Sequence, residues 1–443
     1  MSDLLWPGDT RADPFCTDEA VLTALLRVES AWLAALHHHG LTVAAPDHPP
    51  LDPTAPNSTA PAPPSMTAPT PTAPAATTAP TPTAALPTAP TSTASSASPR
   101  LPDLSDLVGA ADLAGLARDA EAGGNPVIPL VKLLRERSDI RHIHAGLTSQ
   151  DVLDSAMVLV LNDAAARIRA DLAEQVTTLS DLADRHRGTD MAGRTLTQHA
   201  VPITFGLKVA GWLQGVLDAR DALHAAGLPI QIGGAAGSLA APTALAGSTA
   251  KARELVATTA SVLGLPLREP WHTSRAPFTR FGDALVTCTD AWGKIANDVL
   301  VGSRPEIGEL AEAQGGGSSA MPNKQNPVLS VLIRRAALAA PPLAMTLHLA
   351  AANAVDERPD GSWHVEWSTL RTLARRTIVA GSQTAGLLAG LRVDAVRMAT
   401  ILAEARPGID AEQRKYASES GPYLGATDEI IDAVLARAAE KPC

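Results

Sequence analysis

A short segment rich in glycine, serine and amide side chains carries the residues best suited to chemistry. Residues 315–327 read GGGSSAMPNKQNP, with polar side chains at Ser318, Ser319, Lys324 and Asn326. Three successive glycines adopt positive φ at little steric cost and leave backbone N–H groups uncovered. Hydroxyls, an ammonium and an amide together can hold a carboxylate and receive charge that develops on it. The alternative is a flexible interhelical linker with solvated polar groups.

A second polar cluster stands directly before the longest helical pattern of the chain. The segment HIHAGLTSQDVLDSA contains His144, Thr148, Ser149 and Gln150. Free N–H groups at a helix start favour an anion, and the hydroxyls of Thr148 and Ser149 can bind the same carboxylate. His144 is a candidate proton donor, since imidazoles in general titrate near working pH. Plain N-capping is the competing explanation for both hydroxyls.

Two further segments contain candidate ligands for an acidic substrate. The segment GRTLTQHAVPITFG offers Thr195, Gln198 and His199 ahead of another predicted helix, with a core or turn histidine as the alternative. The segment EPWHTSRAPFTRFGD carries Arg275 and Arg280. Two fixed cations can clamp a polyanion, whereas ordinary surface arginines are the alternative.

Several classes of protein are made improbable by composition and by missing motifs. A net charge of −10 and a pI of about 5.6 argue against a nucleic-acid or anionic membrane surface. The three cysteines are far apart, which fits a reduced, cytoplasmic compartment, and we expect no membrane-spanning segment. There is no Walker-type loop, dinucleotide fingerprint, HExxH or paired-cysteine spacing, so neither a metal nor a nucleotide cofactor is expected.

The periodicity of apolar residues predicts an all-α protein. Residues 19–36 place leucine, valine and tryptophan at helix-face spacing, and residues 151–187 run without proline or glycine. A helix of that length would span roughly 55 Å, more than a compact monomer usually needs, which favours a bundle shared between subunits. Further helical runs are predicted at 205–226, 284–301, 327–340, 343–352 and 370–391.

These patterns divide the chain into five parts. We predict an N-terminal helical segment (1–45), a disordered Pro/Thr/Ala-rich insert (46–100), the remainder of the N-terminal domain (101–150), a central bundle with the loop 315–327 (151–352) and a C-terminal helical domain (353–443). The insert contains too many prolines for helix and too little apolar side-chain area for a core.

The loop sequence GSSAMPNKQNP resembles the signature loop of the fumarase/aspartase superfamily, helical enzymes that eliminate across the carbon next to a carboxylate. The TSQD and GRTLTQHA segments fall where the other two signature regions of that superfamily are expected. The stretches GGNPVIPLVKLL, EPWHTSR and GSWHVEW are similar to the 3-carboxy-cis,cis-muconate cycloisomerase branch. The chain departs from that branch at Leu196, where a tryptophan is typical, and at Ala276, where an aspartate is frequent.

This resemblance implies a fumarase/aspartase-like fold whose long central helix bundle is assembled across subunits, a cytoplasmic homotetramer, a small polycarboxylate substrate and no cofactor. It implies Ser318 as the proton-transfer residue with Ser319 beside it, and His144 as a catalytic carboxylate contact or proton relay. The substrate-binding residues that we expect are Thr148, Ser149, Gln150, Thr195, Gln198, His199, Arg275, Met321, Lys324 and Asn326.

The reaction implied is the interconversion of 3-carboxy-cis,cis-muconate and 4-carboxymuconolactone in protocatechuate breakdown. Two alternatives stay open at this stage. One is a lyase of the same superfamily acting on a succinate-type substrate, such as an adenylosuccinate lyase-like enzyme. The other is a non-catalytic helical scaffold.

Overall fold

Long helices dominate the computed structural model, which describes residues 3–41, 103–321, 323–416 and 423–441. The expected insert (46–100) lies outside the described residues. Residues 1–41 and 103–443 belong to one compact unit, within which the predicted divisions at 150 and 352 stay predictions. The helices are α1 (Asp18–His38), α2 (Leu113–Gly123), α3 (Val127–Glu136), α4 (Ser149–Arg185), α5 (Phe205–Ala225), α6 (Ala240–Ala246), α7 (Thr249–Leu263), α8 (Ala276–Gly302), α9 (Val328–Ala352), α10 (Gly361–Ala389), α11 (Ala395–Gln413) and α12 (Thr427–Ala439).

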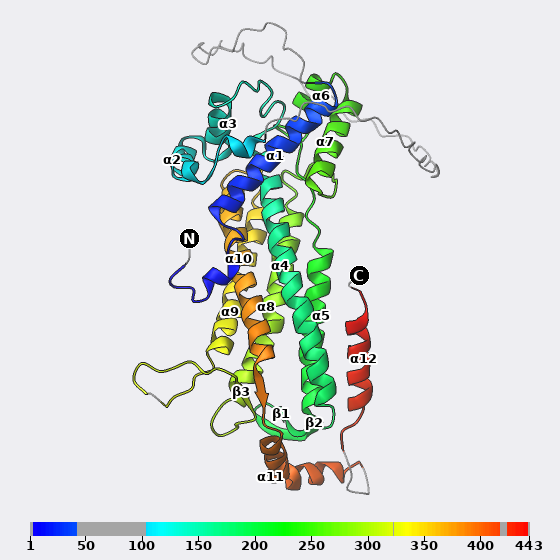
Figure 1. The fold of residues 1–443 in the computed structure, drawn as a ribbon. Coiled ribbons are helices and arrows are strands. Elements are labelled where there is room, and N and C mark those ends of the chain that lie inside the picture. The colour runs from blue at the N-terminus through cyan, green and yellow to red at the C-terminus, as the bar shows by residue number, and fades with distance from the viewer. Residues whose placement is uncertain (1–2, 42–102, 322, 417–422, 442–443) are drawn as a thin grey trace, which may run out of the picture. The chain divides into compact units, whose positions relative to one another are not determined.

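Five long helices, α4, α5, α8, α9 and α10, pack side by side as the central bundle (Figure 1). The first third of α4 is buried all round, from Gln150 to Leu161, and most of it is valine, leucine, alanine and methionine. A helix that is apolar on every face must be surrounded by other elements. The all-α prediction is therefore confirmed, and α4 is the element around which the neighbouring helices pack.

One helix boundary predicted from the sequence is wrong. Two runs, 327–340 and 343–352, were expected to be separated by Pro341 and Pro342, yet α9 continues through both prolines. Each proline lacks an N–H and removes one backbone hydrogen bond, but α9 packs along both α8 and α10. Tertiary packing over its length holds α9 together where local propensity would end it.

The segment 190–204, which precedes the predicted helix 205–226, is a β-hairpin. Strands β1 (Asp190–Thr195) and β2 (Gln198–Thr204) pair antiparallel, and the two residues between them, Leu196 and Thr197, both have positive φ. Two left-handed residues in a two-residue turn match the twist of a hairpin. A second small pair, β3 (Leu310–Glu312) with β4 (Leu391–Val393), lies at the same end of the central bundle (Figure 1).

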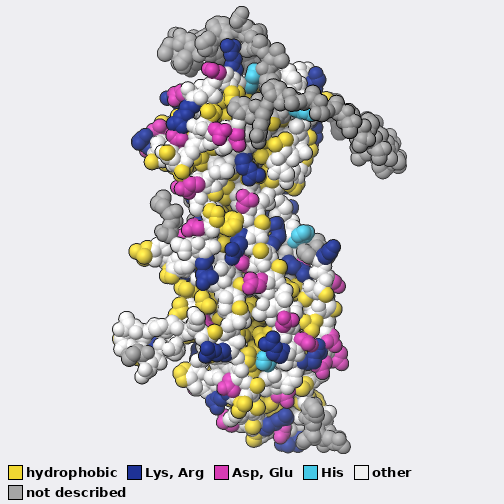
Figure 2. All heavy atoms as spheres, in the orientation of Figure 1, with side chains coloured by type: hydrophobic (Ala, Val, Ile, Leu, Met, Phe, Trp, Pro, Cys, Tyr) yellow, Lys and Arg dark blue, Asp and Glu magenta, His cyan; other side chains and the backbone are white. Residues whose placement is uncertain are grey.

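Two helices, α1 and α9, are long and apolar enough to cross a membrane by length and composition. Most of α1 is buried against α4 and α7, as expected of a core helix. By contrast α9 leaves a row of apolar side chains exposed at Val331, Leu338, Met345 and Leu349. On the face drawn in Figure 2, acidic and basic side chains of the described residues are interspersed, and neither sign gathers into a patch.

The junction of α4 and α5 provides a test of this packing. At Gly206 a Cβ atom would lie 2.6 Å from the Ala183 carbonyl oxygen, whereas at Gly211, on the same helix, no atom lies within 4 Å. We expect Gly206→Ala to lower the free energy of unfolding by about 1–3 kcal/mol, because the backbones must separate. Gly211→Ala should raise it by up to about 1 kcal/mol through the helix propensity of alanine. Urea unfolding of both variants measures the difference, and equal effects would contradict the packing described.

Candidate active site

The glycine-rich loop is tied at its base and open at its tip. Gly316 and Asn326 form an antiparallel bridge with N–O distances of 2.7 and 2.9 Å. A Cβ atom on Gly316 would collide with Val328, so this position requires glycine. Just before the loop, the buried carboxylate of Glu312 accepts bonds from the backbone N–H groups of Leu329 and Ser330, and so caps α9. The loop projects from the central bundle between β3 and α9 (Figure 1).

Within this loop, Ser318 has the surroundings of a stabilised nucleophilic oxygen. Its Oγ accepts hydrogen bonds from the backbone N–H groups of Ala320 at 3.3 Å and Met321 at 3.1 Å. N–H groups aimed at an oxygen favour its charged form, since they compensate developing negative charge without reorganisation. Ser318 is half-buried in the chain, while Ser319 and Lys324 are exposed and free to meet a ligand.

Two other residues of the loop that were predicted to bind substrate, Asn326 and Met321, differ in how free their side chains are to contact it. Asn326 is half-buried and donates one amide hydrogen to the carbonyl of Gly317 at 3.2 Å, so part of its capacity holds the loop in shape. Met321 is exposed, at 61% of its accessible surface. Such a side chain can cover a bound substrate once the loop folds over it.

The second cluster surrounds the start of α4. His144, Thr148 and Ser149 are all partly exposed, and Arg358 donates to the Thr148 hydroxyl at 3.2 Å while stacking on the Trp363 ring. A cavity of about 480 Å³ opens beside this turn. Its lining consists of Val127, Ile128, Val131, Lys132, Arg135, Glu136, His144 and Ser149. Two cations, an imidazole and a helix N-terminus therefore face one small volume, which suits an acidic ligand.

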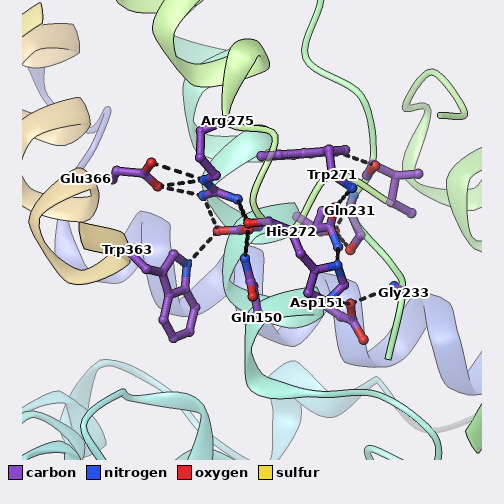
Figure 3. Close-up of polar contacts among 12 residues, drawn as sticks. Gln150, Asp151, Gln231, Gly233, Trp271, His272, Arg275, Trp363 and Glu366 are labelled. Carbon is purple, nitrogen blue, oxygen red and sulfur yellow. Dashed lines mark hydrogen bonds and ion pairs between the residues drawn. The ribbon is translucent and has the colours of Figure 1, made fainter. Parts of the chain in front are cut away.

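Arg275 and Gln150, both expected to bind substrate, belong to the core. The Arg275 guanidinium is buried and forms ion pairs with Asp154 at 2.7 Å and Glu366 at 2.6 Å (Figure 3). Gln150 is fully buried and donates to Asp154 and to the carbonyl of His272. These contacts join α4, α8 and α10 and hold both side chains in the core of this chain, while their role as substrate ligands stays a prediction.

His272, which lies in the same core, also has a structural role. The Gln231 amide donates to its Nδ1 at 2.8 Å, and its Nε2 donates to the Gly234 carbonyl at 2.9 Å (Figure 3). Both ring nitrogens are therefore satisfied in one neutral tautomer. Burial lowers the pKa of His272, which keeps the ring neutral.

Burial also shifts the carboxyl groups of this core. Asp151 accepts from the N–H groups of Thr148, Gly233 and Gly234, yet burial raises its pKa to about 7 against these three bonds. The pKa of Glu366 is likewise raised by burial and opposed by the charge of Arg275. Perturbed carboxyls often mark active sites, but these are enclosed within the helix junction and serve its architecture.

The third cluster lies on the β1–β2 hairpin. Thr195, Gln198 and His199 are exposed around the turn, whose tip residue Leu196 is 96% exposed. Arg194 forms a bidentate ion pair with the buried Glu309 at 2.8 Å for each bond. Glu309 directly precedes β3, so the hairpin and the base of the glycine-rich loop are held at the same end of the bundle.

A single chain does not bring all three clusters together. The second cluster stands at the first residue of α4, and the hairpin begins five residues after its last, Arg185. A 37-residue helix extends for roughly 55 Å at 1.5 Å per residue. The residues His144, Thr148 and Ser149 are therefore far from Thr195, Gln198, His199 and the loop of the same chain.

Several residues near the second cluster were missed from the sequence, among them Glu29, Lys132 and Arg135. Glu29 did leave a signal, because it interrupts the apolar stripe of α1, which repeats at 22, 25, 29, 32 and 36. A charge on a buried face calls for a partner. The two cations on α3 left no such signal, since exposed lysine and arginine are ordinary on helices.

Known proteins with similar sequences indicate the family of this chain. Residues 119–340 match a protein family described as Lyase. The chain belongs to this lyase family. Nitrosuccinate lyase of Streptomyces davaonensis is 46% identical over 301 residues, which cover 65% of this chain and 63% of that protein, so the chain spans less than two thirds of its length. 3-Carboxy-cis,cis-muconate cycloisomerase of Bradyrhizobium diazoefficiens is 39% identical over 345 residues, which cover 74% and 75%.

Solved structures of lyase-family enzymes have the same fold. The 3-carboxy-cis,cis-muconate lactonizing enzyme of Pseudomonas putida has a TM-score of 0.63 at 30% identity, over 73% of this chain and 85% of that one. A fumarate lyase from Mesorhizobium sp. has a TM-score of 0.64 at 28% identity, over 72% and 85%. The predicted fumarase/aspartase-like fold is thus confirmed, and the lyase family consists of enzymes that act on small carboxylates.

The structural assignment of Arg275 can be tested by removing its charge. Arg275→Met leaves Asp154 and Glu366 buried without a counterion, so we expect a loss of about 3–5 kcal/mol in the free energy of unfolding. The matched control is Arg253→Met, which removes an arginine from an exposed pair with Glu269 and should change stability little. Denaturant unfolding measures both variants. Unchanged stability of Arg275→Met together with a raised KM would instead favour the substrate-clamp role.

Proposed function

We propose that this protein catalyses β-elimination from a 2-substituted succinate, with nitrosuccinate as the first substrate to test and fumarate and nitrite as products. The observation that carries the proposal is the pair of backbone N–H groups on Ser318 Oγ, in a loop that also presents Lys324. The 46% identity to a nitrosuccinate lyase supports the leaving group. The departures at Leu196 and Ala276 from the cycloisomerase pattern point the same way.

The substrate has two central carbons, each next to a carboxylate, and one of them bears the leaving group. The chemistry begins at the other carbon. The Ser318 oxyanion accepts a proton from this carbon and becomes a hydroxyl, the C–H electron pair forms the C=C bond, and nitrite departs with the electron pair of the C–N bond. A serine hydroxyl is a weak base, so the N–H groups of Ala320 and Met321 are needed to stabilise its oxyanion. Closure of the loop over the substrate excludes water and strengthens these bonds.

Removal of that proton pushes a second negative charge into the neighbouring carboxylate. Preorganised donors must already surround this group, because only interactions that strengthen in the transition state raise the rate. Lys324 from the loop, and Thr148 and Ser149 at the N-terminus of α4, are our candidates. His144 and the hairpin residues Thr195, Gln198 and His199 complete the expected pocket.

Since these groups lie at opposite ends of α4, we propose that each site forms between chains of a homo-oligomer, expected to be a tetramer. The exposed apolar row of α9, at Val331, Leu338, Met345 and Leu349, supports this proposal. Its spacing of seven, seven and four residues keeps the row on one helix face, as at helix–helix interfaces. Neither a cofactor nor a metal has a role in the proposed steps.

Cycloisomerisation of 3-carboxy-cis,cis-muconate is the second candidate, supported by the 39% identical relative and by the structure from Pseudomonas putida. Its reverse step is chemically parallel, because a proton leaves the carbon beside a carboxylate while a carboxylate oxygen departs as the leaving group. The same loop can serve both reactions. What differs is the shape of the pocket at the leaving group, to which the exposed Leu196 of another chain would contribute.

A direct comparison of substrates tests the proposal. Purified protein is incubated with nitrosuccinate, 3-carboxy-cis,cis-muconate or adenylosuccinate while nitrite, fumarate and the diene absorbance are followed. Release of nitrite and fumarate in equal amounts is the expected result. Loss of the diene absorbance alone would establish the second candidate, and no change with any substrate would favour a non-catalytic scaffold.

Replacement of the proposed base gives a sharper prediction. Ser318→Ala should lower kcat by about 10²- to 10⁴-fold with an unchanged melting temperature, since the hydroxyl accepts loop bonds but fills no core space. The matched control is Thr400→Ala on α11, whose exposed hydroxyl bonds only to its own helix. Full turnover by Ser318→Ala would rule out the assignment.

A further inference from the structure

His144 occupies an unusual backbone position beside the cavity. Its φ is 64°, in the left-handed region that a non-glycine residue adopts only where its surroundings impose it. The side chain is 16% exposed and lines the cavity of about 480 Å³. Strain of this kind persists where a side chain has to be aimed, which raises the question of what aims this one.

The partner of His144 is a buried carboxylate on α1. Glu29 Oε1 lies 2.6 Å from His144 Nδ1, and the Glu29 side chain is fully buried. Its second oxygen, Oε2, has no hydrogen-bond partner in the described part of the chain. Burying a carboxylate costs several kcal/mol, and a half-satisfied one is a poor device for stability alone.

The turn that carries His144 has a second tie to the same face of α1. Trp32, three residues after Glu29 and also fully buried, donates its Nε1 hydrogen to the Ala145 carbonyl at 2.7 Å. This bond fixes the backbone of the turn without touching the imidazole. The backbone is therefore held independently, and the contact of Glu29 acts on the ring itself.

We propose that Glu29 is a positioning residue that accepts the Nδ1 hydrogen of His144 and so aims the ring, whose imidazolium form donates its Nε2 hydrogen to a substrate carboxylate in the cavity. An ionised carboxylate only accepts hydrogen bonds, so Nδ1 must carry the hydrogen. Nε2 makes no hydrogen bond within the described residues, and Ser149 shares the cavity lining. Of the other charged groups lining the cavity, Lys132 and Arg135 attract an anion and Glu136 repels it. The proposal deepens the proposed function and rests on it for the identity of the ligand.

One test needs no substrate. Full-length protein labelled with [¹⁵N]histidine is measured by solid-state NMR, and the His144 signals are assigned by their loss in His144→Ala. We expect protonated Nδ1 in the wild type and a changed Nδ1 signal in Glu29→Gln, which keeps the shape of the side chain and removes its charge. A bare Nδ1 with the hydrogen on Nε2 in the wild type would overturn the proposal.

The second test is a double-mutant cycle on turnover. Glu29→Gln should lower kcat/KM on the order of 10- to 100-fold, the scale seen when a partner that orients a functional histidine is removed. In a His144→Ala background the same change should have no further effect, because Glu29 acts only through the imidazole. The matched control is Trp32→Phe, whose effect should be the same in both backgrounds since it loosens the turn.

The outcomes separate this proposal from the proposed function. An equal loss from Glu29→Gln in both backgrounds would make Glu29 merely structural, even if nitrosuccinate is a good substrate. If the wild type converts 3-carboxy-cis,cis-muconate instead, the same cycle is run on that substrate. If it converts neither, the proposed function fails, while the NMR measurement still decides whether Glu29 sets the tautomer of His144.

Discussion

The length of α4 is the constraint on which the rest of the structure depends. Its 37 residues run through the whole bundle, so the polar turn at its start and the hairpin after its end cannot meet within one chain. The helices α5, α10 and α1 pack alongside α4 and bury it. The distance between the clusters is therefore a fixed property of the fold, and any site that needs all of them has to draw on neighbouring chains.

Charged groups in this protein divide into two kinds according to burial. Arg275, Asp154 and Glu366 neutralise one another inside the helix junction, where the low dielectric makes an unpaired charge costly. Lys324, Lys132 and Arg135 are exposed, and Ser318 rests on backbone N–H groups alone. The first kind fixes the ends of α4, α8 and α10, and the second is left for an acidic ligand. Glu29 shares a property with each kind, because it is buried like the first and binds His144, which lines the cavity.

The helices were predictable because their apolar spacing is a local property, and α1, α4 and α5 were found close to the expected bounds, whereas α10 begins nine residues before the expected start. The break expected in α9 is absent because the packing of this helix on both sides outweighs the loss of backbone hydrogen bonds at its two prolines. The loop at 315–327 could be recognised from its residue types and its signature. The structural role of Arg275 could not be recognised from the sequence. An arginine that binds a substrate and one that binds Asp154 look alike until the fold places the carboxylates. The separation of the clusters follows from the unbroken helix that was predicted over 151–187 and is confirmed as α4.

In the proposed oligomer, Ser318 and His144 of one active site come from different chains. The most direct test is to co-express Ser318→Ala with His144→Ala and to purify the mixed oligomers. Each variant alone should be nearly inactive, whereas random mixing should restore roughly a quarter of the sites, because half of the loops and half of the α4 turns remain intact. Recovered activity near that level is the predicted result. Mixed oligomers as inactive as the parents would show that both residues act within one chain and would contradict the account.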